Sequence, residues 1–276
     1  MRKLFGVSLL LCLVLAGPAL AGDLPSPVQA LKAGQFSLGI SGAWQSEQRF
    51  KDADIKTATI YSNGSRENAS SPFADLKLKD DQFYLATLTY GLNDFLNVFA
   101  RAGVATGAKE QYSWMNNGRW STTEVKLEDA FTWGVGGKAR LFETTGGLGA
   151  TVSVQYLRYE HRDEQRPLVN GAPMTLDRFD YQAEYQQVDV AAALYQRLGA
   201  FTPYVGLGYD WARFEFSGTF GMVADYTGSG DFSTTNQDNL AALAGLDFAL
   251  GSNFSFNLQG SFVSQTALAL GLTFLF

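Results

Sequence analysis

The single histidine of the chain stands among acidic residues. His161 lies in the stretch YEHRDEQR, beside Glu160 and close to Asp163 and Glu164. A histidine next to carboxylates can take a proton from water or from a hydroxyl group during hydrolysis. No serine lies within a few residues of His161, and a mixed-charge stretch of this kind is usually solvated surface. We therefore predict no catalytic residue, and a hydrolase that uses His161 remains an alternative.

Three other stretches could hold ligands of other kinds. GVGGKA and TTGGLGA are rich in glycine, but they fall in a predicted strand and a predicted turn, without the following helix that would hold a phosphate. DYTGSGD offers oxygen ligands for Ca²⁺ but lacks the ligand spacing and terminal Glu of a known calcium loop. We expect neither a cofactor nor a metal ion.

The first residues have the pattern of an export signal. Arg2 and Lys3 precede an apolar run over residues 4–16, and the small-residue stretch GPALA ends at Ala21. This order is typical of a secretory signal peptide, so we predict that residues 1–21 are removed. The apolar run is shorter than the roughly 20 residues of a membrane-spanning helix. Residues 22–34 would then form a periplasmic N-terminal segment.

Charge and cysteine content exclude other classes. The formal net charge is −6, and loss of Arg2 and Lys3 would make it −8. No basic stripe is left to neutralise the phosphates of a nucleic acid, so we expect no nucleic-acid partner. The one cysteine, Cys12, lies in the predicted signal peptide, and the exported chain must gain its stability without disulfides.

Beyond the signal, apolar residues recur at every second position, which predicts β-strands with one apolar face. The ten stretches that show this alternation are 36–44, 84–90, 96–104, 131–141, 150–156, 187–194, 204–211, 240–248, 255–262 and 267–276. Tight turns at Asn93-Asp94 and Gly251-Ser252-Asn253 join neighbouring stretches into hairpins.

The connections between these strands are unequal in a regular way. Short turns alternate with long segments near 46–81, 106–128, 158–184 and 213–238, and a brief link spans 264–266. An even strand count, with long connections on one side and both termini on the other, is typical of a transmembrane β-barrel. Hydrocarbon offers no hydrogen-bond partner, so the sheet must close on itself. We predict an all-β, antiparallel, up-and-down transmembrane barrel of ten strands over residues 35–276, whose last strand pairs with the strand that starts near Phe36.

Two alternatives to this fold stay open. IKTATIY and ADLKLK also look like strands; their charges favour an extension of the wall above the membrane, but as a spanning pair they would make the count twelve. A count of eight is the other variant. A soluble periplasmic β-sandwich also has alternating strands, with its apolar faces in a core. Turns that are short on one side only, together with the export signal, favour the barrel.

Segments such as LTYGLNDFLNVFARAGVA and FTPYVGLGYDW carry a resemblance to the small monomeric outer-membrane β-barrels of Gram-negative bacteria. The resemblance implies a monomer in the bacterial outer membrane, in contact with its lipids and with lipopolysaccharide. It also implies that the barrel-insertion machinery reads the C-terminal strand, whose aromatic residues are Phe274 and Phe276. The strand count resembles the omptin proteases, but no paired-aspartate motif aligns in the first long segment. An omptin-like hydrolase using His161 is therefore only an alternative.

If the apolar positions face lipid, the intervening positions line the lumen. They are mostly small or polar and include six charged residues, which are Arg101, Lys138, Arg140, Asp189, Asp210 and Asp247. A barrel of this size is only slightly wider than one that its own side chains fill. We therefore expect the six charges to form an ion-pair and hydrogen-bond network that plugs the lumen of a structural or surface-interaction protein. A narrow channel for small solutes is the alternative.

Overall fold

A computed structural model describes residues 26, 31–116, 119–163, 168–173, 178–222, 226–263 and 265–276. Its regular elements are all β-strands, joined by antiparallel pairs. Within the described residues, no helix is long and apolar enough to cross a membrane. The predicted signal peptide, residues 1–21, lies outside the described residues.

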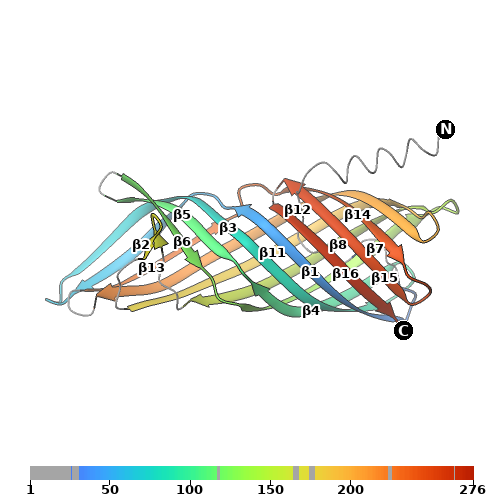
Figure 1. Ribbon diagram of the computed structural model, residues 1–276, viewed down its shortest axis with the longest axis horizontal. Coiled ribbons are helices and arrows are strands. Elements are labelled where there is room, and N and C mark those ends of the chain that lie inside the picture. Colours follow the sequence, from blue (N-terminus) through green and yellow to red (C-terminus); the bar gives the residue numbers. More distant parts are fainter. Residues whose placement is uncertain are drawn as a thin grey trace.

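Ten of the described strands pair in a closed ring (Figure 1). In chain order they are β1 (Phe36–Arg49), β3 (Arg66–Gly91), β4 (Leu96–Thr106), β7 (Ala130–Glu143), β8 (Leu148–Asp163), β11 (Arg178–Gln196), β12 (Phe201–Met222), β14 (Leu240–Ala249), β15 (Phe254–Val263) and β16 (Gln265–Leu275). β1 pairs with β3 on one side and with β16 on the other, where Ser37 lies opposite Leu275. The predicted pairing of the last strand with the first is confirmed, and no edge is left open in the ring.

The two ends of the barrel differ. At one end the strands are joined by four tight connections, 92–95, 144–147, 197–200 and 250–253, and the C-terminus lies there too (Figure 1). We call this the short-turn end and the opposite one the tall end. β3, β8, β11 and β12 continue well beyond the other ring strands toward the tall end.

At the tall end, shorter strands extend the wall. β2 (Ala53–Tyr61) pairs with β3, and β13 (Tyr226–Thr235) joins β2 to β12. β5 (Lys109–Asn116), β6 (Arg119–Lys126), β9 (Leu168–Val169) and β10 (Ala172–Pro173) follow on the other side of β3. The prediction that IKTATIY and ADLKLK extend the wall is confirmed. The long segments predicted as connections are mostly sheet in their described residues, because β2, β5, β6 and β13 lie within them.

Bulges in β1 and β3 lie at the level where the wall of the tall end begins. Gln45 and Gln48 of β1 are both buried although three residues apart, and so are Leu78 and Asp81 of β3. An odd spacing between two inward residues requires one extra residue in the strand. In β3 that residue is Asp80, which has a positive φ of 56°. The bulges therefore shift the phase of the alternation, which a fixed period of two does not predict.

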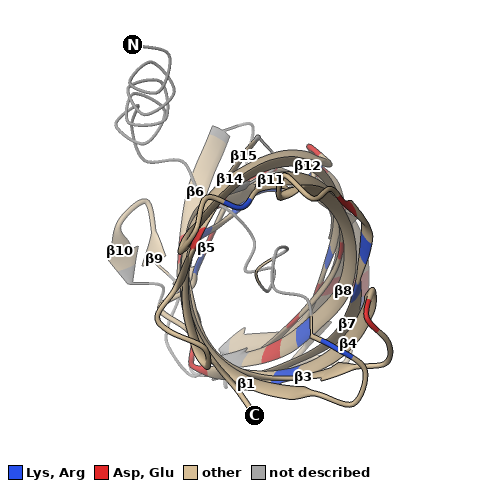
Figure 2. Ribbon diagram, turned by 90° about the vertical axis from the view of Figure 1, so that its right-hand side faces the viewer, with Lys and Arg blue, Asp and Glu red and all other residues tan. Residues whose placement is uncertain are grey.

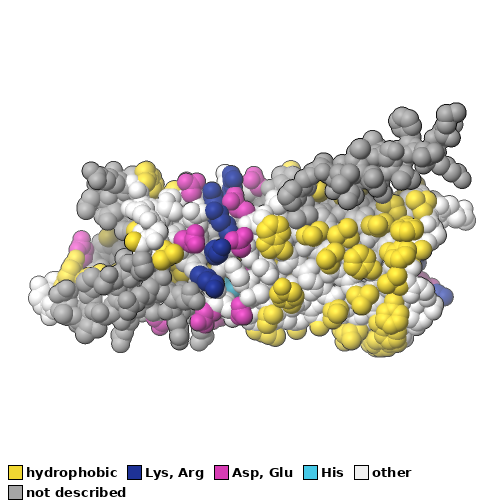
Figure 3. All heavy atoms as spheres, viewed as in Figure 1, with side chains coloured by type: hydrophobic (Ala, Val, Ile, Leu, Met, Phe, Trp, Pro, Cys, Tyr) yellow, Lys and Arg dark blue, Asp and Glu magenta, His cyan; other side chains and the backbone are white. Residues whose placement is uncertain are grey.

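The outer surface is divided in the same way. Figure 3 shows apolar side chains gathered over the half nearer the short-turn end, bounded by a belt of charged side chains. Outward residues of the apolar half include Ile40, Leu88, Val135, Val205, Leu207 and Leu272, each at least 36% exposed. We call this half the apolar band. A soluble protein rarely exposes so continuous an apolar surface, whereas a membrane barrel requires one.

The apolar band predicts that a charge is tolerated differently along a single strand. Leu207→Arg places a cation in the middle of the band, where Leu207 is 72% exposed. Arginine at the bilayer midplane costs roughly 2–4 kcal/mol. Ser217→Arg, on the same strand and the same outward parity, lies beyond the band and should change stability by less than about 0.5 kcal/mol. Urea titration of the barrel folded in lipid vesicles measures both; equal effects would contradict the assignment of the band.

Candidate functional site in the lumen and on the outer wall

Two of the predicted lumen charges lie near the short-turn end and meet at a residue of the N-terminal segment. The Lys138 ammonium donates to the carbonyl oxygen of Ser26 at 2.5 Å, and the Ser26 hydroxyl donates to Asp247. Asn257 also donates to Asp247, at 3.1 Å. Figure 2 views the barrel from this end. Leu31, of the same segment, is 1% exposed.

The next charges lie further into the lumen and are linked by amides. Arg101 donates to Gln155 at 3.1 Å, and Gln155 donates to Asp189 at 2.8 Å. Asp189 lies directly opposite Asp210 in the register of β11 and β12. Gln48 of β1 donates to Asp210 at 3.5 Å from across the barrel. The sequence pattern did not single out these glutamines, although their inward positions follow from the alternation.

Arg140 does not join the lumen charges. Its guanidinium pairs with Glu143 at 3.2 Å and donates to the carbonyl oxygen of Asp94 at 2.5 Å. Glu143 also pairs with Arg197 at 2.8 Å. These residues lie at the short-turn end, where they hold neighbouring turns together. Of the six predicted residues, the structure buries the other five.

Above the charges, toward the tall end, tyrosines cross the lumen. Tyr159 of β8 donates to Asp81 of β3 at 2.7 Å, and its ring stacks on Tyr185 of β11 at 4.7 Å. Tyr185 in turn donates to Gln48 of β1 at 2.6 Å, and Phe50 packs edge-on against it at 6.4 Å. Neither β3 and β8 nor β1 and β11 are neighbours in the ring. These contacts therefore pass through the interior rather than along the wall.

The interior of the tall end is mostly apolar. Its buried side chains form one cluster that includes Phe73, Leu76, Leu78, Val125, Leu127, Phe214 and Phe232. Tyr181 of β11 reaches Glu110 of β5 within this region. Inside and outside are thus exchanged between the two halves: the apolar band faces outward around a polar lumen, whereas the tall end is polar outside and apolar inside.

His161 lies inside this arrangement. It is 1% exposed, its ring stands edge-on to Tyr159 at 5.1 Å, and its Nδ1 lies 2.5 Å from the carbonyl oxygen of Glu128. Burial lowers the pKa of His161 to about 4, against which Glu128 and the charge of Asp129 act only partly. Among the described residues, His161 Nε2 has no hydrogen-bond partner. The interpretation of His161 as part of a solvated surface is wrong, because Leu157, Tyr159 and His161 continue the inward parity of β8.

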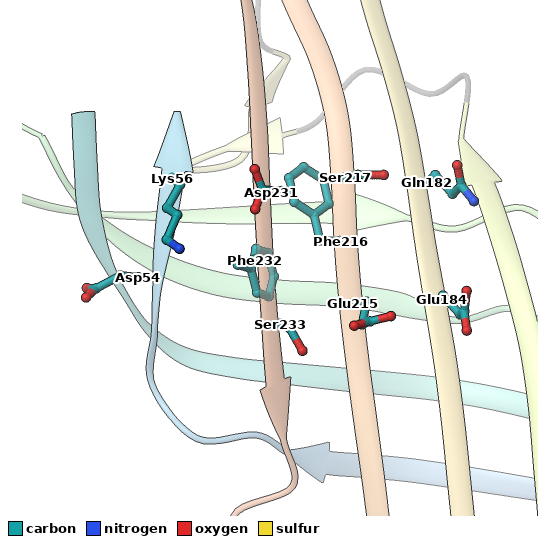
Figure 4. Close-up of a pocket in the computed structure, with 10 residues that line it drawn as sticks. All are labelled: Asp54, Lys56, Gln182, Glu184, Glu215, Phe216, Ser217, Asp231, Phe232 and Ser233. Carbon is teal, nitrogen blue, oxygen red and sulfur yellow. The ribbon is translucent and has the colours of Figure 1, made fainter. Parts of the chain in front are cut away.

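A groove of about 490 Å³ lies on the outer wall of the tall end (Figure 4). Its lining comes from four neighbouring strands and comprises Asp54, Lys56, Gln182, Glu184, Glu215, Phe216, Ser217, Asp231, Phe232 and Ser233. The exposed polar residues alternate with the inward phenylalanines, so the polar ones form the outward face. Arg158 pairs with Glu184 at 2.9 Å, and Arg213 pairs with Glu215, along the edge nearer the apolar band.

Comparison with solved structures decides the class of fold. The chain resembles the outer membrane protease OmpT from Escherichia coli with a TM-score of 0.52 and 12% identity, over 92% of this chain and 99% of that one. The fold is that of a bacterial outer-membrane β-barrel. The outer membrane protein OprG from Pseudomonas aeruginosa matches with a TM-score of 0.45 and 13% identity, over 90% and 99% of the two chains. In sequence, the chain matches no family model and no curated protein.

Asp81 and His161 predict opposite pH dependences of stability. Burial raises the pKa of Asp81 from 3.8 to about 7, although Tyr159 donates to its carboxylate. The contribution of Asp81 to the stability of the folded barrel is therefore present below pH 4 and is lost as the pH rises through 7. The lowered pKa of His161 works the other way: its contribution is present above pH 6.5 and is lost as the pH falls through 4.

Relative to the wild type, Asp81→Asn should therefore gain stability as the pH rises from 4 to 7. His161→Gln should lose stability relative to the wild type over the rise from 4 to 6.5. Each group contributes a slope of up to about 1.4 kcal/mol per pH unit. Urea titrations across this range measure both slopes. Slopes of the same sign in the two variants would contradict the burial of one of these groups.

Proposed function

We propose that this chain is an integral outer-membrane barrel whose lumen is closed by its own side chains, and that it acts through its outer wall rather than by transport. The observation that carries the proposal is the set of contacts across the interior. Tyr159 to Asp81 and Tyr185 to Gln48 each join strands on different sides of the ring. A solute on the barrel axis would have to displace these side chains.

Closure is supported at three levels along the axis. Ser26 lies between Lys138 and Asp247 near the short-turn end. Arg101 reaches Ser41, Thr87 and Gln155 further in, so one guanidinium links three strands besides its own. The aromatic cluster of the tall end follows. A narrow channel would need a continuous polar path through all three.

The same geometry disfavours catalysis. A histidine that acts as a general base must reach the proton it removes from a bound substrate. His161 is enclosed by Tyr159 and by the carbonyl oxygen of Glu128, and burial keeps it neutral at physiological pH. We therefore propose a role without catalysis.

Assembly in the membrane completes the proposal. Removal of residues 1–21 and insertion by the barrel-insertion machinery follow from the export signal and from the exposed C-terminal rings. Phe276 is 61% exposed and Phe274 38%, and Phe276 stacks beside Phe36 of the first strand at 6.3 Å. Because the ring of strands is closed, a single chain can supply all the backbone hydrogen-bond partners of its membrane-facing strands.

The closed lumen predicts no current steps when the wild-type barrel is inserted in a planar lipid bilayer. A variant in which Phe50, Tyr159 and Tyr185, together with Arg101, Lys138 and Asp247, are replaced by Ala removes side chains at all three levels, and should give resolvable conductance. The matched control replaces the outward residues Phe131, Tyr84 and Tyr209, which are 67%, 54% and 51% exposed, by Ala. It should remain silent. Steady current through the wild type would contradict the proposal.

The non-catalytic role predicts that the folded wild type cleaves neither peptide nor ester substrates in detergent or in lipid vesicles. His161→Ala should give the same background. Cleavage by the wild type that is lost in His161→Ala would establish the hydrolase instead.

A further inference from the structure

Two arginines of the outer wall lie close to the apolar band. Arg158 follows Tyr156 by two residues on β8, and Arg213 follows Trp211 by two residues on β12. Aromatic side chains at outward positions are typical of the membrane–water interface of a barrel. Arg158 and Arg213 therefore lie just beyond that interface, at the level of lipid headgroups.

The two arginines lie side by side across one strand. In the register, Gln186 of β11 pairs with Arg158 on one side and with Arg213 on the other. Two strand spacings are about 10 Å, which two long side chains can span toward one phosphate group. Arginine suits this task because its planar fork of donors matches the oxygens of a phosphate.

Acidic residues hold both guanidinium groups in place. Arg158 Nη2 pairs with Glu184 at 2.9 Å, and Arg213 pairs with Glu215 and donates from Nε to Ser233 at 3.1 Å. Each guanidinium has five donors, so these contacts leave donors available. The side chains are 39% and 43% exposed. Both glutamates lie on the side away from the apolar band, which leaves the band side of the arginines to a ligand.

The groove of Figure 4 lies next to the two arginines, on the side away from the apolar band. Glu184, Glu215 and Ser233 line its edge, and Ser217 and Asp231 lie beyond them. Carboxylates, hydroxyls and amides are suited to the hydroxyl groups of a sugar. From the membrane outward, the wall thus presents apolar side chains, two arginines and a polar groove. That order matches acyl chains, phosphate and sugar.

We propose that Arg158, Arg213 and the adjoining groove bind one phosphorylated glycolipid of the outer leaflet, with the phosphate between the arginines and the sugar in the groove. This inference rests on the proposed membrane-spanning barrel, because only insertion brings a lipid headgroup to the arginines.

The test uses the full chain refolded in phosphatidylcholine vesicles, where heat-modifiable migration on a gel first establishes insertion. Vesicles then receive bisphosphorylated lipid A, dephosphorylated lipid A or phosphatidic acid, or the buffer receives inorganic phosphate. Native mass spectrometry measures retained lipid, and urea titration measures stabilisation. The wild type should retain bisphosphorylated lipid A most strongly. Inorganic phosphate should neither bind nor displace it.

The double variant Arg158→Gln, Arg213→Gln should weaken lipid A binding by about tenfold for each arginine removed, the range of a hydrogen bond to a charged group. Lysine at both positions should restore part of the binding, because it keeps the charge without the fork. Arg197→Gln is the matched control: Arg197 is also held by a glutamate, Glu143 at 2.8 Å, but lies at the short-turn end, away from the groove. Ser217→Trp fills the groove and should weaken lipid A binding while leaving phosphatidic acid unchanged.

Equal binding by the wild type and the double glutamine variant would overturn this inference, and so would an equal loss in Arg197→Gln. Binding of phosphatidic acid as tight as that of lipid A would remove the sugar from the proposal. Strong binding of inorganic phosphate would remove the lipid. If the wild type does not insert at all, the proposed function fails as well, whereas insertion without lipid A retention overturns only this inference.

Discussion

Backbone hydrogen bonding in hydrocarbon is the constraint on which the rest of this structure depends. A lipid tail can neither donate nor accept, so each strand of the apolar band must find both neighbours within the chain. β1 meets this demand by pairing with β3 and with β16, so that the first and the last strand of the chain close the ring. Once the ring is closed, its radius follows, and so does the space that inward side chains have to fill.

How that space is filled changes with the surroundings of the wall. Behind the apolar band, the inward residues are polar. Amides such as Gln155 link Arg101 to Asp189, so that charge is compensated inside the barrel. Beyond the band the wall faces water, and the apolar residues turn inward as they do in a soluble protein. The bulges in β1 and β3 lie at this change, because they let the apolar parity of a strand turn from the outer face to the inner face.

In the proposed function, recognition takes place on the outer wall. Side chains that cross the lumen would then occupy the path of a solute, and His161 would be part of that filling. What remains accessible is the surface beyond the band, where rigid strands hold Arg158 and Arg213 beside a polar groove. Residues on paired strands keep their spacing better than residues on loops, which favours recognition of a ligand with a fixed order of groups.

The sequence by itself determined the barrel, the ring strands, the side on which the short turns lie and the inward position of five of the six lumen charges. Each follows from local alternation and from the length of the connections. The inward parity of β8 and β11 also continues past Tyr156, so alternation alone would have placed Tyr159, Tyr185 and His161 on the inner face. Only the tertiary structure decided that the long segments other than 46–81 contribute wall as well, that Arg140 pairs with Glu143 at the short-turn end, and that Tyr159 and Tyr185 meet β3 and β1 across the interior. These outcomes depend on contacts between strands that are far apart in the chain, which leave no local periodic signal.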